Sequence, residues 1–135
     1  MKSQLSTEEE QIALEEVMDN YKNPQNFGVL KDHTFFKHQK NAHCGDVFDL
    51  YVKLNDKKKI IDVKYTGEGC AISTASFSML SEKLIGMKLK DARKLSDSDM
   101  YKIFKIPISP SRINCAMLSL NAFHNGLEHY EFAYK

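Results

Sequence analysis

Hydrophobic and polar positions alternate in the first half of the chain, whereas apolar residues recur every three or four positions in the second half. Every second residue from Phe48 to Leu54 is apolar, and the residues between them are mostly polar, which is typical of a strand with one buried face. A polar tract, residues 55–59, follows this strand as a hairpin loop. The expected strands are residues 34–39, 46–54 and 60–65. We therefore predict a small antiparallel sheet of three strands.

Helical spacing flanks these strands on both sides. Thr7 and Glu10 have the spacing of a capping box ahead of an apolar stripe, and Asn23-Pro24 ends it, so residues 1–22 are expected to form an N-terminal helix. A second helix is expected after Cys70, from Ala71 until Gly86. Further helices are expected at residues 90–95, at residues 98–104 with Asp97 as a cap, and from Arg112 or Asn114 to about Tyr130. Strands early and helices late predict an α+β fold, the sheet packing against several helices.

Composition bounds the class of protein. A chain of 135 residues without a linker-like segment is expected to form a single domain, 1–135, with its own core. The net charge of +1 comes from interspersed charges, which argues against nucleic-acid and acidic-membrane partners. No apolar run reaches membrane-spanning length, and the first ten residues are polar and acidic rather than a targeting peptide, so we expect a cytoplasmic protein.

Three cysteines and one aspartate carry the candidate chemistry. Cys44 and Asp46 share the run His-Cys-Gly-Asp, Cys70 follows Gly-Glu-Gly, and Cys115 follows Arg-Ile-Asn. Each cysteine lies beside a glycine turn or a helix start, where backbone N–H groups lower a thiol pKa. In an extended segment Cys44 and Asp46 project to the same side. Zinc accepts three thiolates and a carboxylate, and thiolates also suit iron in a sulfide cluster, although a free cysteine is commonly an inert core residue.

Four ordered motifs link the chain to a known family. They are Asn-Pro-Gln-Asn-Phe-Gly at 23–28, Cys-Gly-Asp at 44–46, Gly-Glu-Gly-Cys-Ala-Ile-Ser-Thr-Ala-Ser at 67–76, and Pro-Ser-Arg-Ile-Asn-Cys-Ala-Met-Leu at 110–118. Through them nearly the whole chain resembles the U-type iron–sulfur cluster assembly scaffolds (the IscU, NifU N-terminal and SufU family). The resemblance implies that Cys44, Asp46, Cys70 and Cys115 bind zinc, iron or a transient [2Fe-2S] cluster. It also implies three kinds of partner: a cysteine desulfurase that supplies sulfur, an iron donor and recipient apoproteins.

The chain departs from each branch of that family. Asn114 stands where the IscU branch has a histidine, and residues 106–112 keep little of the chaperone-recognition motif Leu-Pro-Pro-Val-Lys, so a chaperone partner is left open. The run Gly-Cys-Ala-Ile-Ser and Arg112 resemble the SufU branch, which implies a zinc-dependent sulfurtransferase, but the extra SufU segment between the second and third cysteines is missing. Scaffold and sulfurtransferase, and hence whether the chain is an enzyme, stay open at this point.

A sulfur-transfer step requires one thiolate to attack a persulfide. By resemblance to the IscU branch we expect Cys115 to be the acceptor, with Cys44 as the alternative that the SufU branch suggests, and Arg112 to stabilise the thiolate or persulfide charge. Two rivals come from other classes. A purely structural zinc domain would use the same four ligands, and a cysteine hydrolase would need a histidine paired with one thiol, for which only His43 is local.

Overall fold

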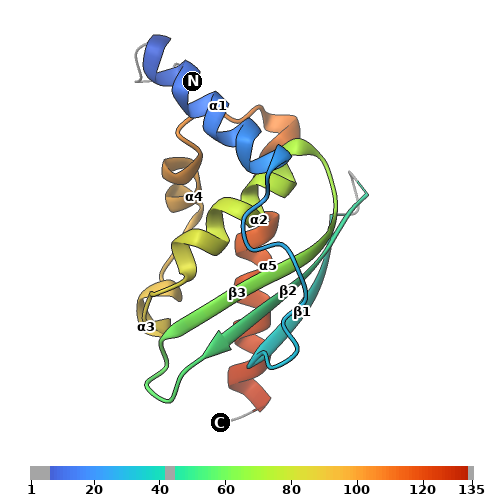
Figure 1. Ribbon diagram of the computed structural model, residues 1–135, viewed down its shortest axis with the longest axis vertical. Helices are drawn as coiled ribbons and strands as arrows, with labels where there is room; N and C mark the ends of the chain where they lie inside the picture. The colour runs from blue at the N-terminus through green and yellow to red at the C-terminus, as the bar shows by residue number, and fades with distance from the viewer. Residues whose placement is uncertain (1–6, 42–44, 134–135) are drawn as a thin grey trace.

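A three-stranded antiparallel sheet forms one layer of the computed structural model, and helices α2 and α5 pack against one of its faces (Figure 1). The structure describes residues 7–41 and 45–133. The strands are β1 (Phe35–Asn41), β2 (Asp46–Leu54) and β3 (Ile60–Glu68), in the spatial order β1-β2-β3. The helices are α1 (Thr7–Lys22), α2 (Ala71–Leu84), α3 (Leu89–Ala92), α4 (Asp97–Phe104), the 3-10 turn η1 (Pro110–Arg112) and α5 (Ile113–Ala133). The predicted α+β fold is confirmed.

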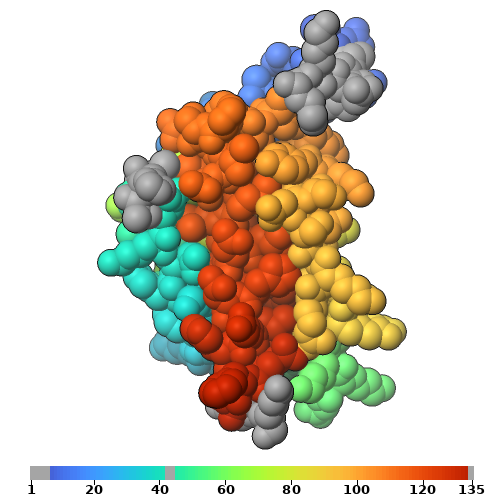
Figure 2. Space-filling view, turned by 180° about the vertical axis from the view of Figure 1, so that it is seen from behind, coloured from blue at the N-terminus to red at the C-terminus, as the bar shows by residue number. Residues whose placement is uncertain are grey.

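The alternation along β2 places its apolar side chains toward the helices. Phe48 is buried in this layer, and its ring stacks on that of Phe77 from α2 with 4.3 Å between the ring centroids. On β1, Phe35 contacts Phe123 of α5 at 6.0 Å between centroids. Burial of apolar rings between the layers is the main source of stability here, because it removes large apolar surfaces from water. From the other side, α5 runs between β1 and the segment that holds α3 and α4 (Figure 2).

Buried serines of α2 hydrogen-bond the helices and the segment that surround it. The Ser76 hydroxyl donates to the Ala116 carbonyl of α5 at 2.8 Å, and the Ser78 hydroxyl donates to Asn20 Oδ1 of α1 at 2.5 Å. The Asn26 amide donates to Ser81 Oγ at 2.9 Å, which ties the segment after α1 to the same helix. Buried hydroxyl groups need such partners. The serines therefore have a structural role in joining α1, α2 and α5.

Three predicted details differ from the structure. The N-cap of α4 is Ser96 rather than Asp97, because the Asp99 carboxylate accepts the Ser96 backbone N–H at 2.8 Å and so closes a capping box from that residue. The helix predicted at residues 90–95 is a single turn, Leu89–Ala92, in which only the first and last residues are buried. Strands β1 and β3 are longer than predicted, since Asn41 pairs with Asp46 and Glu68 pairs with Val47. Backbone pairing continues there through polar residues that carry no strand signal.

Residues 7–41 and 45–133 contain no helix that combines the length and the apolar character needed to cross a membrane.

Candidate metal centre

Asp46, Cys70 and Cys115 meet where several elements of the fold begin or end. Asp46 is the first residue of β2, Cys70 directly precedes α2, and Cys115 is the third residue of α5. One ligand atom from each side chain lies within 4.8 Å of the other two. In a tetrahedral zinc site with Zn–S bonds of about 2.3 Å, two sulfur atoms lie roughly 3.8 Å apart, so only a small shift brings these donors to bonding positions.

The Cys70 thiol is placed by the link between β3 and α2. Cys70 is the N-cap of α2, and its sulfur accepts the Ser73 backbone N–H at 3.4 Å, while the Ser73 hydroxyl donates to the Cys70 carbonyl at 3.1 Å. Gly69 makes this turn possible, because a Cβ there would lie 2.3 Å from Ser73 Oγ and 2.8 Å from Asp46 Oδ1. The Gly-Cys pair thus brings the thiol and the carboxylate together.

Asp46 is buried, with 1% of its surface exposed. Its Oδ1 atom accepts the Cys70 backbone N–H at 3.0 Å, and its Oδ2 atom accepts the Asn41 side-chain amide at 3.4 Å. The same amide nitrogen lies 3.6 Å from Cys115 Sγ. A buried carboxylate without such donors would be costly, so these hydrogen bonds satisfy and orient the Asp46 side chain. Asn41 was not predicted as a site residue, because a polar residue at a strand end gives no metal signal.

The two described thiols differ in exposure, and the pKa of the Cys70 thiol is lowered. Burial by itself raises the pKa of the Cys70 thiol, but hydrogen bonds from the Ser73 backbone and hydroxyl and from Cys115 outweigh that effect and leave the pKa below its ordinary value. Cys70 is half-buried, whereas Cys115 is fully buried. A lowered pKa favours the thiolate, which is the form that binds metal and attacks a persulfide.

The remaining predicted site residues are Cys44 and Arg112. Cys44 lies outside the described residues, as does His43. Gly45 is in the left-handed region with φ +70° and forms part of the turn between β1 and β2, so the expected extended backbone from Cys44 to Asp46 is wrong at that residue. Arg112 ends η1 and is exposed, three residues before Cys115. Its predicted role as a thiolate stabiliser stays a prediction.

The cluster of Asp46, Cys70 and Cys115 includes no histidine among the described residues. The His38 ring hydrogen-bonds Asp49 at 2.6 Å, the His124 ring hydrogen-bonds the Leu95 carbonyl at 2.7 Å, and neither belongs to the cluster of Asp46, Cys70 and Cys115. A cysteine hydrolase needs an imidazole beside its thiol. The part of the chain that the structure describes therefore offers that rival no support.

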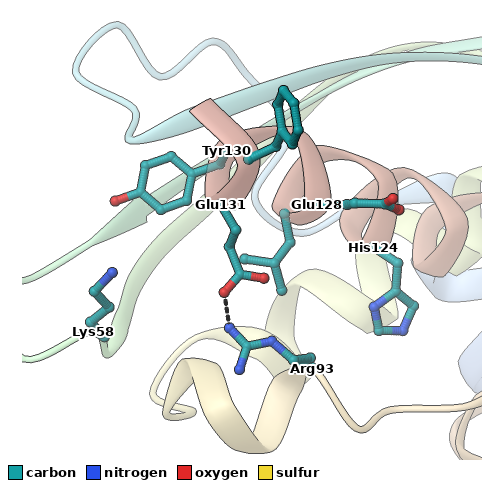
Figure 3. Close-up of a pocket in the computed structure, with 8 residues that line it drawn as sticks. Lys58, Arg93, His124, Glu128, Tyr130 and Glu131 are labelled. Carbon is teal, nitrogen blue, oxygen red and sulfur yellow. Dashed lines mark hydrogen bonds and ion pairs between the residues drawn. The ribbon is translucent and has the colours of Figure 1, made fainter. Parts of the chain in front are cut away.

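A surface pocket lies at the C-terminal end of α5 (Figure 3). It carries groups of both charges: Arg93 pairs with Glu131, and Lys58 Nζ lies 5.7 Å from the centre of the Tyr130 ring. The residues that line it are Lys58, Arg93, His124, Leu127, Glu128, Tyr130, Glu131 and Phe132. A lining with both positive and negative groups and apolar side chains does not select one ligand chemistry.

The chain is similar to known proteins over most of its length. The family model "NifU-like N terminal domain" matches residues 12–135. The iron–sulfur cluster assembly enzyme IscU of Drosophila melanogaster is 35% identical over 120 residues, which cover 87% of this chain and 77% of that protein. The zinc-dependent sulfurtransferase SufU of Bacillus subtilis is 36% identical over 128 residues, which cover 82% of this chain and 86% of that protein.

Solved structures give the same result. A crystal structure from Fervidobacterium islandicum, of a putative iron–sulfur cluster assembly scaffold for the SUF system, has a TM-score of 0.74 and 27% identity. That match covers 84% of this chain and 94% of the solved chain. A NifU-like N-terminal structure from Brucella abortus, at 18% identity and a TM-score of 0.71, shares the fold.

Proposed function

Because the chain belongs to the family of the NifU-like N-terminal domain, we propose that it is an iron–sulfur cluster assembly scaffold. Its cargo is zinc, iron or a nascent [2Fe-2S] cluster, held by Cys44, Asp46, Cys70 and Cys115. One observation carries the proposal: donor atoms of Asp46, Cys70 and Cys115, far apart in the sequence, lie within 4.8 Å of one another. Two thiolates with a carboxylate suit both zinc and iron.

The sulfur for the cluster comes from the persulfide of a cysteine desulfurase. A thiolate of the scaffold attacks the outer persulfide sulfur, a new S–S bond forms on the scaffold, and the desulfurase cysteine leaves as a thiolate with the electron pair of the broken bond. This exchange needs no external electrons. Releasing the bound sulfur as sulfide does consume two electrons, which a thiol reductant supplies while it is oxidised to a disulfide. Such thiol chemistry fits the reducing cytoplasm.

Cys115 is the proposed acceptor and Cys44 the alternative, with Arg112 stabilising the charge on the sulfur. Because Cys115 is fully buried, sulfur reaches it only when the segments around it separate. A hard carboxylate ligand suits this step, since Asp46 binds a soft metal less firmly than a fourth thiolate would. Replacing each cysteine in turn by serine and mapping the persulfide after reaction with a desulfurase identifies the acceptor. Labelling that survives in every single variant would contradict a unique acceptor.

A zinc-dependent sulfurtransferase is the second candidate, and the 36% identity to a Bacillus subtilis protein of that name favours it. The two functions differ in what stays bound. A scaffold accumulates a cluster, whereas a sulfurtransferase keeps its zinc and passes sulfur on. A purely structural zinc domain would show neither behaviour, and chelation would unfold it.

Reconstitution under anaerobic conditions tests the proposal. The purified chain is mixed with a cysteine desulfurase, cysteine, ferrous iron and a thiol reductant, and the visible absorption is followed. We expect a cluster chromophore that is lost in the Cys70→Ser variant. Faster sulfide release with zinc retained would instead establish the sulfurtransferase. If neither response is seen and chelation unfolds the protein, the chain is a purely structural zinc domain. Added iron donors, recipient apoproteins and an Hsp70-type chaperone then test the remaining partners.

A further inference from the structure

Asn41 joins two of the proposed metal ligands from inside the protein. It is the last residue of β1, it is 7% exposed, and its side-chain nitrogen lies 3.4 Å from Asp46 Oδ2 and 3.6 Å from Cys115 Sγ. An amide nitrogen carries two hydrogens, so it can donate one to each acceptor. The nitrogen of the Asn41 amide, rather than its oxygen, faces both ligand atoms.

The backbone around Asn41 holds this amide in place. Asn41 pairs with Asp46 across the two strands, and the Asn41 carbonyl accepts the Gly45 N–H at 3.0 Å. The strand pairing of β1 and β2 therefore extends to Asn41 and Asp46. On its other oxygen, Asp46 accepts the Cys70 N–H at 3.0 Å. Both carboxylate oxygens are consequently held by donors, and a carboxylate oxygen that accepts one hydrogen bond has a further lone pair with which it can bind a metal ion.

We propose that Asn41 is a positioning residue that organises Asp46 and Cys115 for metal binding. This inference rests on the proposed function, since it assigns a role toward the same site. A single amide nitrogen within hydrogen-bonding distance of both ligand side chains holds their donor atoms near each other. Its N–H···S contact also withdraws electron density from the Cys115 sulfur. Hydrogen bonds to ligands from such neighbouring residues typically change metal affinity by about 10- to 100-fold.

Metal titration of two leucine variants tests this role. Asn41→Leu keeps a similar side-chain volume and removes the donors. Asn20→Leu is the matched control, because Asn20 is also a buried asparagine but bonds the Glu16 carbonyl and Ser78, away from the thiols. Zinc affinity is measured by competition with a chromophoric chelator, and cobalt(II) reports the thiolate-to-metal charge-transfer band. Thermal melting of the metal-free proteins establishes that each variant is folded.

We expect Asn41→Leu to bind zinc at least about 10-fold more weakly than the wild type. Its cobalt charge-transfer band should move to lower energy, because a sulfur without the N–H donor gives up electrons more readily. Asn20→Leu should keep the wild-type affinity and spectrum even where its melting temperature falls. Wild-type affinity and spectrum in Asn41→Leu, or equal losses in both variants, would overturn the inference.

A second substitution covers the case in which Asn41→Leu does not fold. Asn41→Ser offers a single shorter donor, so we expect weaker zinc binding and a shifted cobalt band here too, and wild-type values would again overturn the inference. The same titrations distinguish a failure of the proposed function from a failure of the role of Asn41. A wild-type chain whose zinc affinity is unchanged by Cys70→Ser would reject the metal centre itself, whereas wild-type binding that depends on Cys70 but not on Asn41 would reject only the role of Asn41.

Discussion

Gly69 leaves the thiol cluster no room for an added methyl group. In Gly69→Ala the new Cβ would lie 2.3 Å from Ser73 Oγ, 2.8 Å from Asp46 Oδ1 and 2.8 Å from Cε2 of Phe48. The Phe48 ring cannot retreat easily, because it stacks on Phe77 at 4.3 Å between centroids. Relief must therefore come from the Ser73 hydroxyl and the Asp46 carboxylate. Moving them disturbs the Asp46 bond to the Cys70 N–H.

The crowding around Gly69 determines the expected loss of stability in Gly69→Ala. Overpacking a buried position costs about 1 to 3 kcal/mol of the free energy of unfolding. For a chain of 135 residues, each kcal/mol lowers the melting temperature by roughly 3 to 4 °C, at about 2.1 cal/mol/K of unfolding entropy per residue. We therefore expect the metal-free Gly69→Ala variant to melt about 4 to 11 °C below the wild type. Its zinc affinity should fall as well, because Asp46 is displaced.

Calorimetry of the metal-free proteins and chelator competition for zinc measure the two effects. Gly86→Ala is the control: no atom lies within 4 Å of the added Cβ, but φ is +96°, so backbone strain destabilises the protein without touching the site. We expect Gly86→Ala to lower the melting temperature and to leave the zinc affinity unchanged. A Gly69→Ala variant with wild-type melting temperature and zinc affinity would refute the steric argument.

Two further predictions concern stability away from the cluster. Phe77→Ala removes a buried ring stacked on Phe48, and we expect a loss of about 3 to 5 kcal/mol in urea unfolding; a loss below about 1 kcal/mol would show that this contact is not central to the core. In Asp99, hydrogen bonds from the Ser96 N–H and hydroxyl hold the pKa below its usual 3.8. A carboxyl whose folded-state pKa is lowered stabilises the protein above its unfolded pKa, and this contribution is lost as the pH falls through the folded-state pKa. Asp99→Asn should therefore lower stability at pH 7, with the difference from wild type disappearing well below pH 3.8; a difference that persists in acid would contradict this assignment.

Much of the fold follows from local pattern. The period-two alternation of Phe48 to Leu54 predicts the central strand with its correct buried face, and the start of α2 directly after Cys70 follows from the change to helical spacing. Backbone pairing at Asn41 and Glu68 was missed, because hydrogen bonding between strands depends on the partner strand rather than on the residue's own character.

In the candidate site, too, some residues are predictable from the sequence and others are not. Thiols and carboxylates are recognisable from residue type and motif, so Asp46, Cys70 and Cys115 were expected to meet, and the structure brings their donor atoms within 4.8 Å. Asn41 acts through contacts that exist only after the strands and α5 pack together. The left-handed conformation of Gly45 likewise depends on how β1 and β2 pair. The local sequence Cys-Gly-Asp, taken as extended backbone, does not predict it.

X-ray absorption spectroscopy of the chain loaded with one equivalent of zinc tests the central claim most directly, because it counts the atoms bound to the metal. We predict three sulfur atoms at about 2.3 Å and one oxygen at about 2.0 Å. Cys44→Ser, Cys70→Ser and Cys115→Ser should each reduce the sulfur count by one. A sulfur count that any of these replacements leaves unchanged, or zinc bound mainly through nitrogen and oxygen, would contradict a centre built from the three cysteines and Asp46.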